Sequence, residues 1–211
     1  MNIFIIIAAI FLLNEPCHAE IIDGLAAKVG DRVITIREVI TEHKIATILQ
    51  QGEKTVGSSP DASFSRDTLD QMINRELIYR EAINIKSFST QVDIFEEMVG
   101  FEKKFIYPEE LNRFMNREGL MADDLADRFL KISVGSAYLA EKLPYMVSVS
   151  PKEVENYYNQ ERHLFSDKEF KDVEKQIREY LLGKKKTKAI EKLISSLRKQ
   201  ADITYFKLPP L

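Results

Sequence analysis

Hydrophobic and polar positions follow a helical period over most of this chain. Apolar residues recur three and four positions apart in several stretches, and charged residues occupy the positions between them. This spacing places the apolar residues on one side of an α-helix, where they can pack against neighbouring elements. The predicted helices cover residues 35–50, 66–83, 90–105, 108–119 and 122–143, a short helix that opens at Pro151, and residues 168–199.

Capping residues predict where two of these helices begin. Thr35 is followed three residues later by Glu38, and Ser150 is followed by Pro151 and then by Glu153. A hydroxyl and a carboxylate at this spacing each accept a hydrogen bond from a backbone N–H at a helix N-terminus, and proline suits the first helical position. Both sites therefore predict well-defined helix starts.

Proline and glycine predict the helix ends in the middle of the chain. Pro108 and Gly119 stand at the first-turn and C-terminal positions of one short helix. Pro144 follows a long apolar repeat that begins near Ala122, and proline inside a helix removes a backbone hydrogen bond. We therefore predict that the long helix ends at Leu143.

Short β-prone segments lie near both ends of the chain. Residues 26–29 and 33–35 flank the turn-forming residues 30–32, and residues 202–206 form a β-prone tail. A two-stranded hairpin is marginal in water, so we expect the tail to add a third strand. The predicted fold is mainly α, with a small β-sheet formed by an N-terminal hairpin and the C-terminal strand.

The longest apolar run lies at the start of the chain, from Ile3 to Leu13. Its eleven residues rise about 1.5 Å each and cannot cross a hydrocarbon layer of about 30 Å. Small residues at Cys17 and Ala19 fit cleavage after Ala19. We predict that residues 1–19 are a signal peptide and that residues 20–211 form a single exported domain. An uncleaved anchor and a buried N-terminal helix are the alternatives.

Cysteine use favours the bacterial periplasm as the location. The chain has one cysteine, Cys17, and it lies in the predicted leader. The exported part would then have no disulfide and would be stabilised by packing alone, which suits the bacterial periplasm or surface. No stable membrane span is expected after signal cleavage.

The charge balance argues against a nucleic-acid partner. Lys plus Arg number 30 and Asp plus Glu number 33, so the chain lacks a strong positive field. The lysine run 184–186 with Lys188 is interpreted as the solvated face of the last helix rather than as a phosphate or membrane site. The polar stretch 51–65 has no periodicity and predicts a loop.

Residues suited to catalysis or metal binding are scarce in the exported part. Its histidines are His43, on an apolar helix face, and His163, near a helix break, and neither has a cysteine partner or metal-ligand spacing. The acidic pairs 96–97, 109–110 and 123–124 lie at helix starts or exposed faces, where carboxylates favour the helix dipole. We predict no catalytic residues, no metal and no cofactor, and we expect that the protein is not an enzyme.

Large flexible apolar side chains gather in the middle of the chain. Within 27 positions stand Phe95, Met98, Phe101, Phe105, Phe114, Met115 and Met121. Methionine adapts to irregular partners, and exposed apolar surface marks interaction sites. These seven residues are candidates for binding another polypeptide. The alternative is that they form the core of a helical domain.

Five motifs follow one another along the chain: the hairpin 26–35 and the segments 69–82, 117–120, 149–158 and 173–182. In this order they resemble the N-terminal domain of SurA-type periplasmic chaperones, together with the C-terminal helix that closes that domain. The resemblance extends over about residues 22–206. It implies a helical peptide-binding domain closed by its own C-terminal segment.

Two features depart from that family. Its parvulin prolyl-isomerase domains lie between the helix that holds Tyr157 and Tyr158 and the last helix, whereas here only residues 159–167 join these helices. The catalytic module is therefore missing. Met121 stands where the family often has Ser or Thr, so we expect the long helix to fray at its start or to be capped by Asp123.

The resemblance implies an exported, ATP-independent holdase. Such a chaperone binds unfolded or partly folded exported proteins, outer-membrane proteins among them, in an apolar crevice between its helices. The alternative is a non-catalytic structural or assembly subunit that binds one dedicated partner or forms a homodimer. Residual prolyl-isomerase activity is a third hypothesis.

Overall fold

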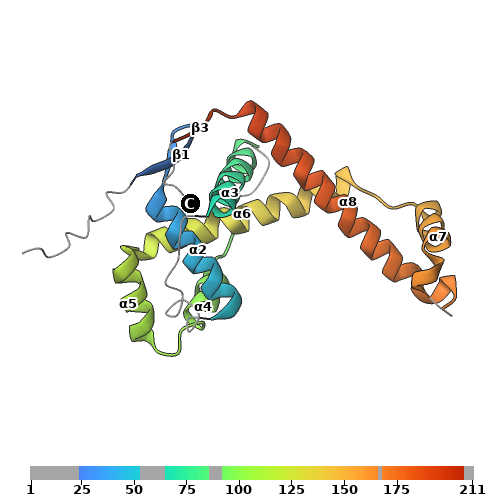
Figure 1. Cartoon of the computed structure of the whole chain (residues 1–211), viewed down its shortest axis with the longest axis horizontal. Helices are drawn as coiled ribbons and strands as arrows, with labels where there is room; N and C mark the ends of the chain where they lie inside the picture. Colours follow the sequence, from blue (N-terminus) through green and yellow to red (C-terminus); the bar gives the residue numbers. More distant parts are fainter. Residues whose placement is uncertain (1–23, 53–64, 86–91, 166–167, 207–211) are drawn as a thin grey trace, which may run out of the picture.

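A computed structural model describes residues 24–52, 65–85, 92–165 and 168–206 of the chain. Helices dominate it, and strands lie near both ends (Figure 1). The elements are β1 (Leu25–Val29), β2 (Arg32–Thr35), α2 (Ile36–Gln51), α3 (Arg66–Asn84), α4 (Phe95–Glu102), α5 (Pro108–Glu118), α6 (Ala122–Met146), α7 (Pro151–Gln160), the 3-10 turn η2 (Arg162–Leu164), α8 (Phe170–Gln200) and β3 (Ile203–Tyr205). The predicted signal peptide and most of the predicted loop 51–65 lie outside the described residues.

The three strands form one antiparallel sheet in the order β2-β1-β3. Lys28 pairs with Val33 of β2 on one side and with Thr204 of β3 on the other. The N–H of Gly30 donates to the carbonyl oxygen of Asp202 at 2.9 Å, which ties the hairpin turn to the segment before β3. The prediction of a mainly α fold, with a small sheet made by the hairpin and the C-terminal strand, is confirmed.

The hairpin turn requires glycine at position 30. Gly30 has a φ of +58°, in the left-handed region that side chains with a Cβ rarely adopt. A Cβ at this position would also lie 2.5 Å from Nη1 of Arg80. The Arg80 guanidinium forms ion pairs with Asp31 in the turn and with Glu76 of α3. The turn and α3 therefore approach each other closely through this arginine.

Both predicted capping boxes are present. The Glu38 N–H donates to Oγ1 of Thr35 at 3.2 Å, and the Thr35 N–H donates to the Glu38 carboxylate at 2.7 Å. At the start of α7, the Glu153 N–H donates to Oγ of Ser150 at 3.3 Å, and the Ser150 N–H donates to the Glu153 carboxylate at 2.9 Å. These bonds satisfy backbone donors that a helix N-terminus leaves unpaired.

The helix α4 is shorter than the predicted helix over 90–105. It begins at Phe95, whose N–H donates to the Asp93 carboxylate at 2.8 Å, and it ends at Glu102. Its apolar residues cover more than one face, so the sequence pattern did not define where the helix stops. Phe105 lies in the turns that follow, and from there it packs back onto the same apolar cluster as Phe101.

The helix α6 is longer than predicted, because it continues through Pro144 to Met146. The predicted end at Leu143 is wrong. Proline removes only one backbone hydrogen bond, and the Val147 N–H still donates to the Leu143 carbonyl oxygen at 3.1 Å, so the last turn closes.

At the start of α6 the expected cap also differs. The Asp124 carboxylate, rather than that of Asp123, accepts a hydrogen bond from the Met121 N–H at 2.7 Å. Asp124 stands at the third helical position, where a carboxylate can reach back to the backbone that precedes the helix. The absence of Ser or Thr at position 121 is therefore compensated in part.

The molecule divides into a body and a lobe that are joined by α8 (Figure 1). The body contains the sheet, α2 to α6 and the C-terminal part of α8, which packs on α3. The lobe comprises residues 151–165 and the N-terminal part of α8. It has its own small apolar cluster, formed by Val154, Tyr158, Val173 and Ile177. The lobe and the body therefore have separate apolar cores.

Candidate functional site

Three of the seven residues predicted to bind a polypeptide lie in the core of the body. Phe101, Phe105 and Phe114 are only 1%, 7% and 2% exposed. The ring centre of Phe101 lies 5.4 Å from that of Phe105, 6.3 Å from that of Phe114 and 6.0 Å from that of Phe129. Tilted and edge-to-face rings at these distances are typical of an aromatic core. The three residues pack α4, α5 and α6 together and offer no open surface in this structure.

The other four predicted residues lie at the edge of this cluster or at the surface. Met98 and Met115 are half-buried and pack against the aromatic rings. Phe95, the first residue of α4, is 64% exposed, and Met121, just before α6, is 69% exposed. The predicted group therefore divides into a core and two exposed side chains.

Further exposed apolar residues were missed by the sequence reasoning. Tyr145 is 87% exposed and Met146 is also exposed, both in the last turn of α6. Leu164 is exposed in the lobe, and Ile106 and Tyr107 are exposed just before α5. All five lie at or near helix ends, where helical periodicity gives the weakest signal. An apolar pair directly after a proline was the one clue available at the end of α6.

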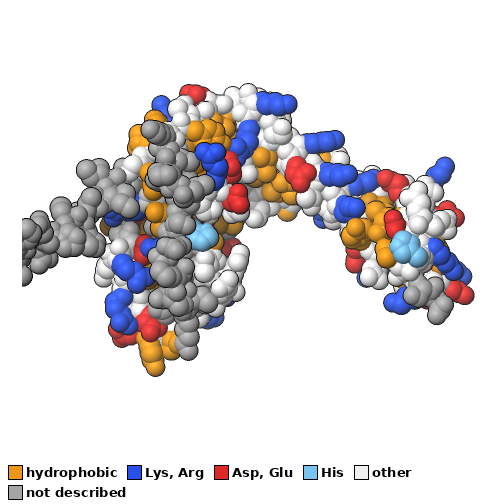
Figure 2. All heavy atoms as spheres, in the orientation of Figure 1, with side chains coloured by type: hydrophobic (Ala, Val, Ile, Leu, Met, Phe, Trp, Pro, Cys, Tyr) orange, Lys and Arg blue, Asp and Glu red, His pale blue; other side chains and the backbone are white. Residues whose placement is uncertain are grey.

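The surface between the body and the lobe is concave. Beneath α8 the space-filling view shows a hollow that separates the two parts (Figure 2). Exposed apolar side chains occur on the body, at the end of α6 and on the lobe. We call Phe95, Met121, Tyr145, Met146 and Leu164 the exposed apolar set. Its members are spread over the molecule: Met121 precedes the first turn of α6, Tyr145 and Met146 lie in its last turn, and Leu164 lies in the lobe.

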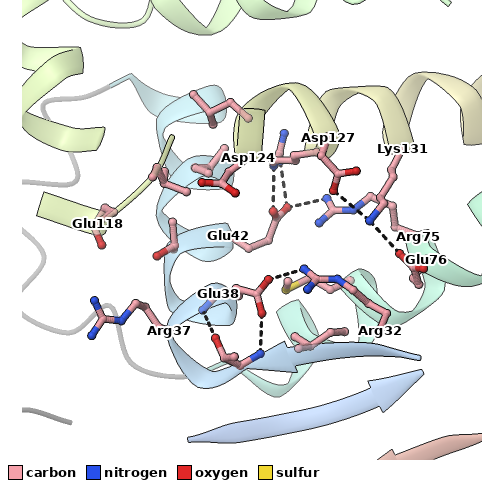
Figure 3. A pocket seen from close by; sticks show the side chains of 18 of the residues that line it. Arg32, Arg37, Glu38, Glu42, Arg75, Glu76, Glu118, Asp124, Asp127 and Lys131 are labelled. Carbon is pink, nitrogen blue, oxygen red and sulfur yellow. Dashed lines mark hydrogen bonds and ion pairs between the residues drawn. The ribbon is translucent and has the colours of Figure 1, made fainter. Parts of the chain in front are cut away.

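The body also contains a cavity of about 500 Å³, lined by residues of the hairpin, α2, α3 and α6 (Figure 3). Part of its lining is apolar and includes Ile34, Ile45 and Met72. Charged side chains of both signs also line it, among them Arg32, Glu42, Arg75, Glu76, Asp127, Arg128 and Lys131.

Glu42 is the centre of one ion-pair group in this cavity. Arg75 donates to its carboxylate from Nη1 at 2.8 Å, and Arg128 donates from Nε at 2.9 Å and from Nη2 at 3.0 Å. Burial opposes ionisation of Glu42, but the hydrogen bonds and charges of the two arginines outweigh it and lower its pKa. The buried Nη1 of Arg128 has no hydrogen-bond partner within the described part of the chain.

Glu76 is the centre of a second group. Its carboxylate lies 2.7 Å from Nε of Arg80 and 3.1 Å from Nζ of Lys131. Lys131 also pairs with Asp127, one turn away on α6, at 3.0 Å (Figure 3). The negative charges of these carboxylates are thus neutralised by cations from neighbouring helices. The ion pairs connect α2, α3 and α6 and so hold these three helices against one another.

The two histidines among the described residues, His43 and His163, lie in unlike surroundings. Nδ1 of His43 lies 3.4 Å from Oγ1 of Thr68, at the boundary between α2 and α3. The side chain of His163 is 71% exposed in the lobe. No group of three or more His, Cys, Asp or Glu side chains among the described residues is placed to hold a metal ion.

No family model matches the chain, and no match to a curated protein was found. The resemblance to SurA-type chaperones therefore stays a prediction from the motifs. Of the helices that the structure describes, none combines the length and apolar character needed to cross a membrane.

Proposed function

We propose that the protein is an exported, ATP-independent holdase that binds unfolded or partly folded client proteins, outer-membrane proteins among them. The clients contact the exposed apolar set on the body, at the end of α6 and on the lobe. Binding of this kind needs no catalytic group and no nucleotide. In this proposal the periplasm is the site of action.

One observation carries the proposal: large apolar side chains are exposed on both the body and the lobe, which flank a concave surface. Met121 and Phe95 lie on the body, Tyr145 and Met146 at the end of α6, and Leu164 on the lobe. Unfolded chains expose apolar side chains at irregular intervals, so a binding surface with separated apolar contacts suits them better than one closed pocket. Burial of each contact contributes through the area removed from water.

The order of the sequence motifs supports the same proposal. They resemble the client-binding part of SurA-type chaperones, and the predicted meeting of the two chain ends is present in the sheet. The lobe contains the short connection between α7 and α8, which is the point in the chain at which that family carries its isomerase domains. A binding function without isomerisation follows from this resemblance.

Suppression of aggregation is the test of this function. The protein purified after export is mixed, without ATP, with several unrelated proteins diluted from denaturant, and light scattering is recorded. We expect suppression for all of them at a few-fold molar excess. No suppression of any client, together with one tight complex isolated from a periplasmic extract, would favour the dedicated assembly subunit instead.

A matched pair of variants locates the binding surface. Leu164→Ser removes an exposed leucine from the lobe, and Leu25→Ser removes an exposed leucine from β1. We expect Leu164→Ser to weaken binding of an unfolded client about fivefold, which corresponds to roughly 1 kcal/mol of lost apolar contact. Leu25→Ser is expected to leave the affinity unchanged. Equal losses in the two variants would contradict the assignment of the lobe to the binding surface.

A further inference from the structure

A second cavity, of about 410 Å³, lies in the lobe between α7 and α8. The helix α7 contributes Glu153, Asn156, Tyr157 and Gln160, and α8 contributes Leu181, Lys184, Lys185 and Lys188. We call this cavity the lobe groove. Its lining combines one tyrosine, one leucine, two side-chain amides, three lysines and one glutamate.

One lysine and the glutamate of the groove neutralise each other. Nζ of Lys185 lies 2.6 Å from the Glu153 carboxylate and also donates to the Ser148 carbonyl oxygen at 2.6 Å. The hydrogen bonds from Lys185 and from Ser150 lower the pKa of Glu153 to about 2. Glu153 is therefore ionised at neutral pH, and its charge is offset by Lys185.

Two positive charges of the groove are left without an anionic partner. Lys184 and Lys188 form no ion pair with another residue in the ranges that the structure describes. They stand four positions apart on one face of α8, where like charges repel each other and destabilise the helix. An anionic ligand in the groove would relieve this repulsion.

The groove also offers an aromatic surface beside these charges. The ring centres of Tyr157 and Tyr180 are 5.5 Å apart, and Nζ of Lys184 lies 5.3 Å from the Tyr180 ring centre. Tyr180 is 48% exposed, and Leu181 lines the groove next to it. Apolar side chains of a ligand can therefore pack beside its charged groups.

Asn156 and Gln160 favour a polypeptide as the ligand. They lie one turn apart on α7 and line the groove. A side-chain amide carries both donors and an acceptor, which matches the N–H and C=O groups of an extended backbone. A long polyanion fits less well, because residues 20–164 carry 18 Lys plus Arg against 25 Asp plus Glu and would repel it.

We propose that the lobe groove binds acidic segments of extended polypeptides. Carboxylates of the segment pair with Lys184 and Lys188, and a neighbouring apolar side chain packs on Tyr157 and Leu181. This inference rests on the proposed holdase function and adds a preference among clients: segments that alternate acidic and apolar residues bind in the lobe.

Peptide binding measured by fluorescence anisotropy tests this preference. The probes are two labelled decapeptides of alternating residues, one with Glu and Phe and one with Gln and Phe. We expect the acidic probe to bind about fivefold more tightly to the wild-type protein at low salt. The difference should disappear in the double variant Lys184→Gln/Lys188→Gln and should shrink as salt is added.

A matched variant controls for the general charge of α8. Lys186→Gln/Lys192→Gln removes two exposed lysines from the same helix that do not line the groove. We expect this variant to keep the preference for the acidic probe. Equal binding of the two probes by the wild type, or an equal loss in both double variants, would overturn the proposal.

Two further measurements separate this inference from the proposed function and from other occupants. Suppression of aggregation by the wild type without a preference for the acidic probe would overturn the groove assignment and leave the holdase standing. A preference for the acidic probe without suppression of aggregation would support the groove assignment and contradict the holdase function.

Sedimentation of the wild type and of Lys184→Gln/Lys188→Gln tests whether a second copy of the chain occupies the groove. A wild-type dimer that dissociates in this variant would assign the groove to a second copy and overturn the peptide proposal.

Discussion

Replacing Phe101 with alanine is expected to lower the free energy of unfolding by about 3–5 kcal/mol. The side chain is 1% exposed and contacts the rings of Phe105, Phe114 and Phe129, so its removal leaves a cavity where three helices meet. The measurement is urea unfolding followed by circular dichroism. A loss below about 1 kcal/mol would contradict the assignment of Phe101 to the core.

Phe95 on the same helix provides the matched control. Phe95→Ala makes the same chemical change at a side chain that is 64% exposed. We expect its free energy of unfolding to stay within about 0.5 kcal/mol of the wild-type value. Binding of an unfolded client should weaken in Phe95→Ala, because Phe95 belongs to the exposed apolar set. The pair thus separates the residues that stabilise the fold from those that contact a client.

Replacing Glu42 with glutamine is expected to lower the free energy of unfolding by about 3 kcal/mol. The change leaves Arg75 and Arg128 largely buried without their carboxylate, and their side chains are only 20% and 10% exposed. Asp127→Asn is the control, since it also converts a carboxylate to an amide on the lining of the same cavity. Asp127 is 53% exposed, and its pair with Lys131 should contribute no more than about 0.5 kcal/mol.

The stability difference between the wild type and Glu42→Gln should depend on pH. The arginines lower the pKa of Glu42 in the folded state below its value in the unfolded chain. The contribution of the carboxylate is therefore fully present above the unfolded pKa and is lost as the pH falls through the folded pKa. Urea unfolding of both proteins over a series of pH values measures this. A difference that grows as the pH falls would contradict the ion-pair assignment.

Local sequence signals were sufficient for most of the fold. The capping boxes at Thr35 and Ser150 depend on residues three positions apart, and the observed helices begin where these boxes predict. The third strand was expected because an isolated hairpin is marginal in water, and β3 does pair with β1. The wrong end at Leu143 arose because the cost of proline is small in a last turn, which propensity alone does not show.

The candidate site was harder to predict, because exposure depends on long-range packing. Phe95 and Phe101 look alike in the sequence, yet one is exposed and the other lies in the core. The packing of α5 and α6, which brings Phe114 and Phe129 against Phe101, separates them. The ion pairs of Glu42 join residues 33 and 86 positions away, a spacing for which the sequence gives no local signal. Leu164 gave no signal either, since a short 3-10 turn has little periodicity.

Site-specific photo-crosslinking tests whether clients bind the exposed apolar set. A photoreactive residue replaces Tyr145, whose side chain is 87% exposed, and in a second protein it replaces Lys175, which is 90% exposed on α8. We expect an unfolded client to crosslink to position 145 and position 175 to give no more than background. Equal crosslinking at the two positions, or none at position 145 while the client remains bound, would contradict the claim that clients bind the exposed apolar set.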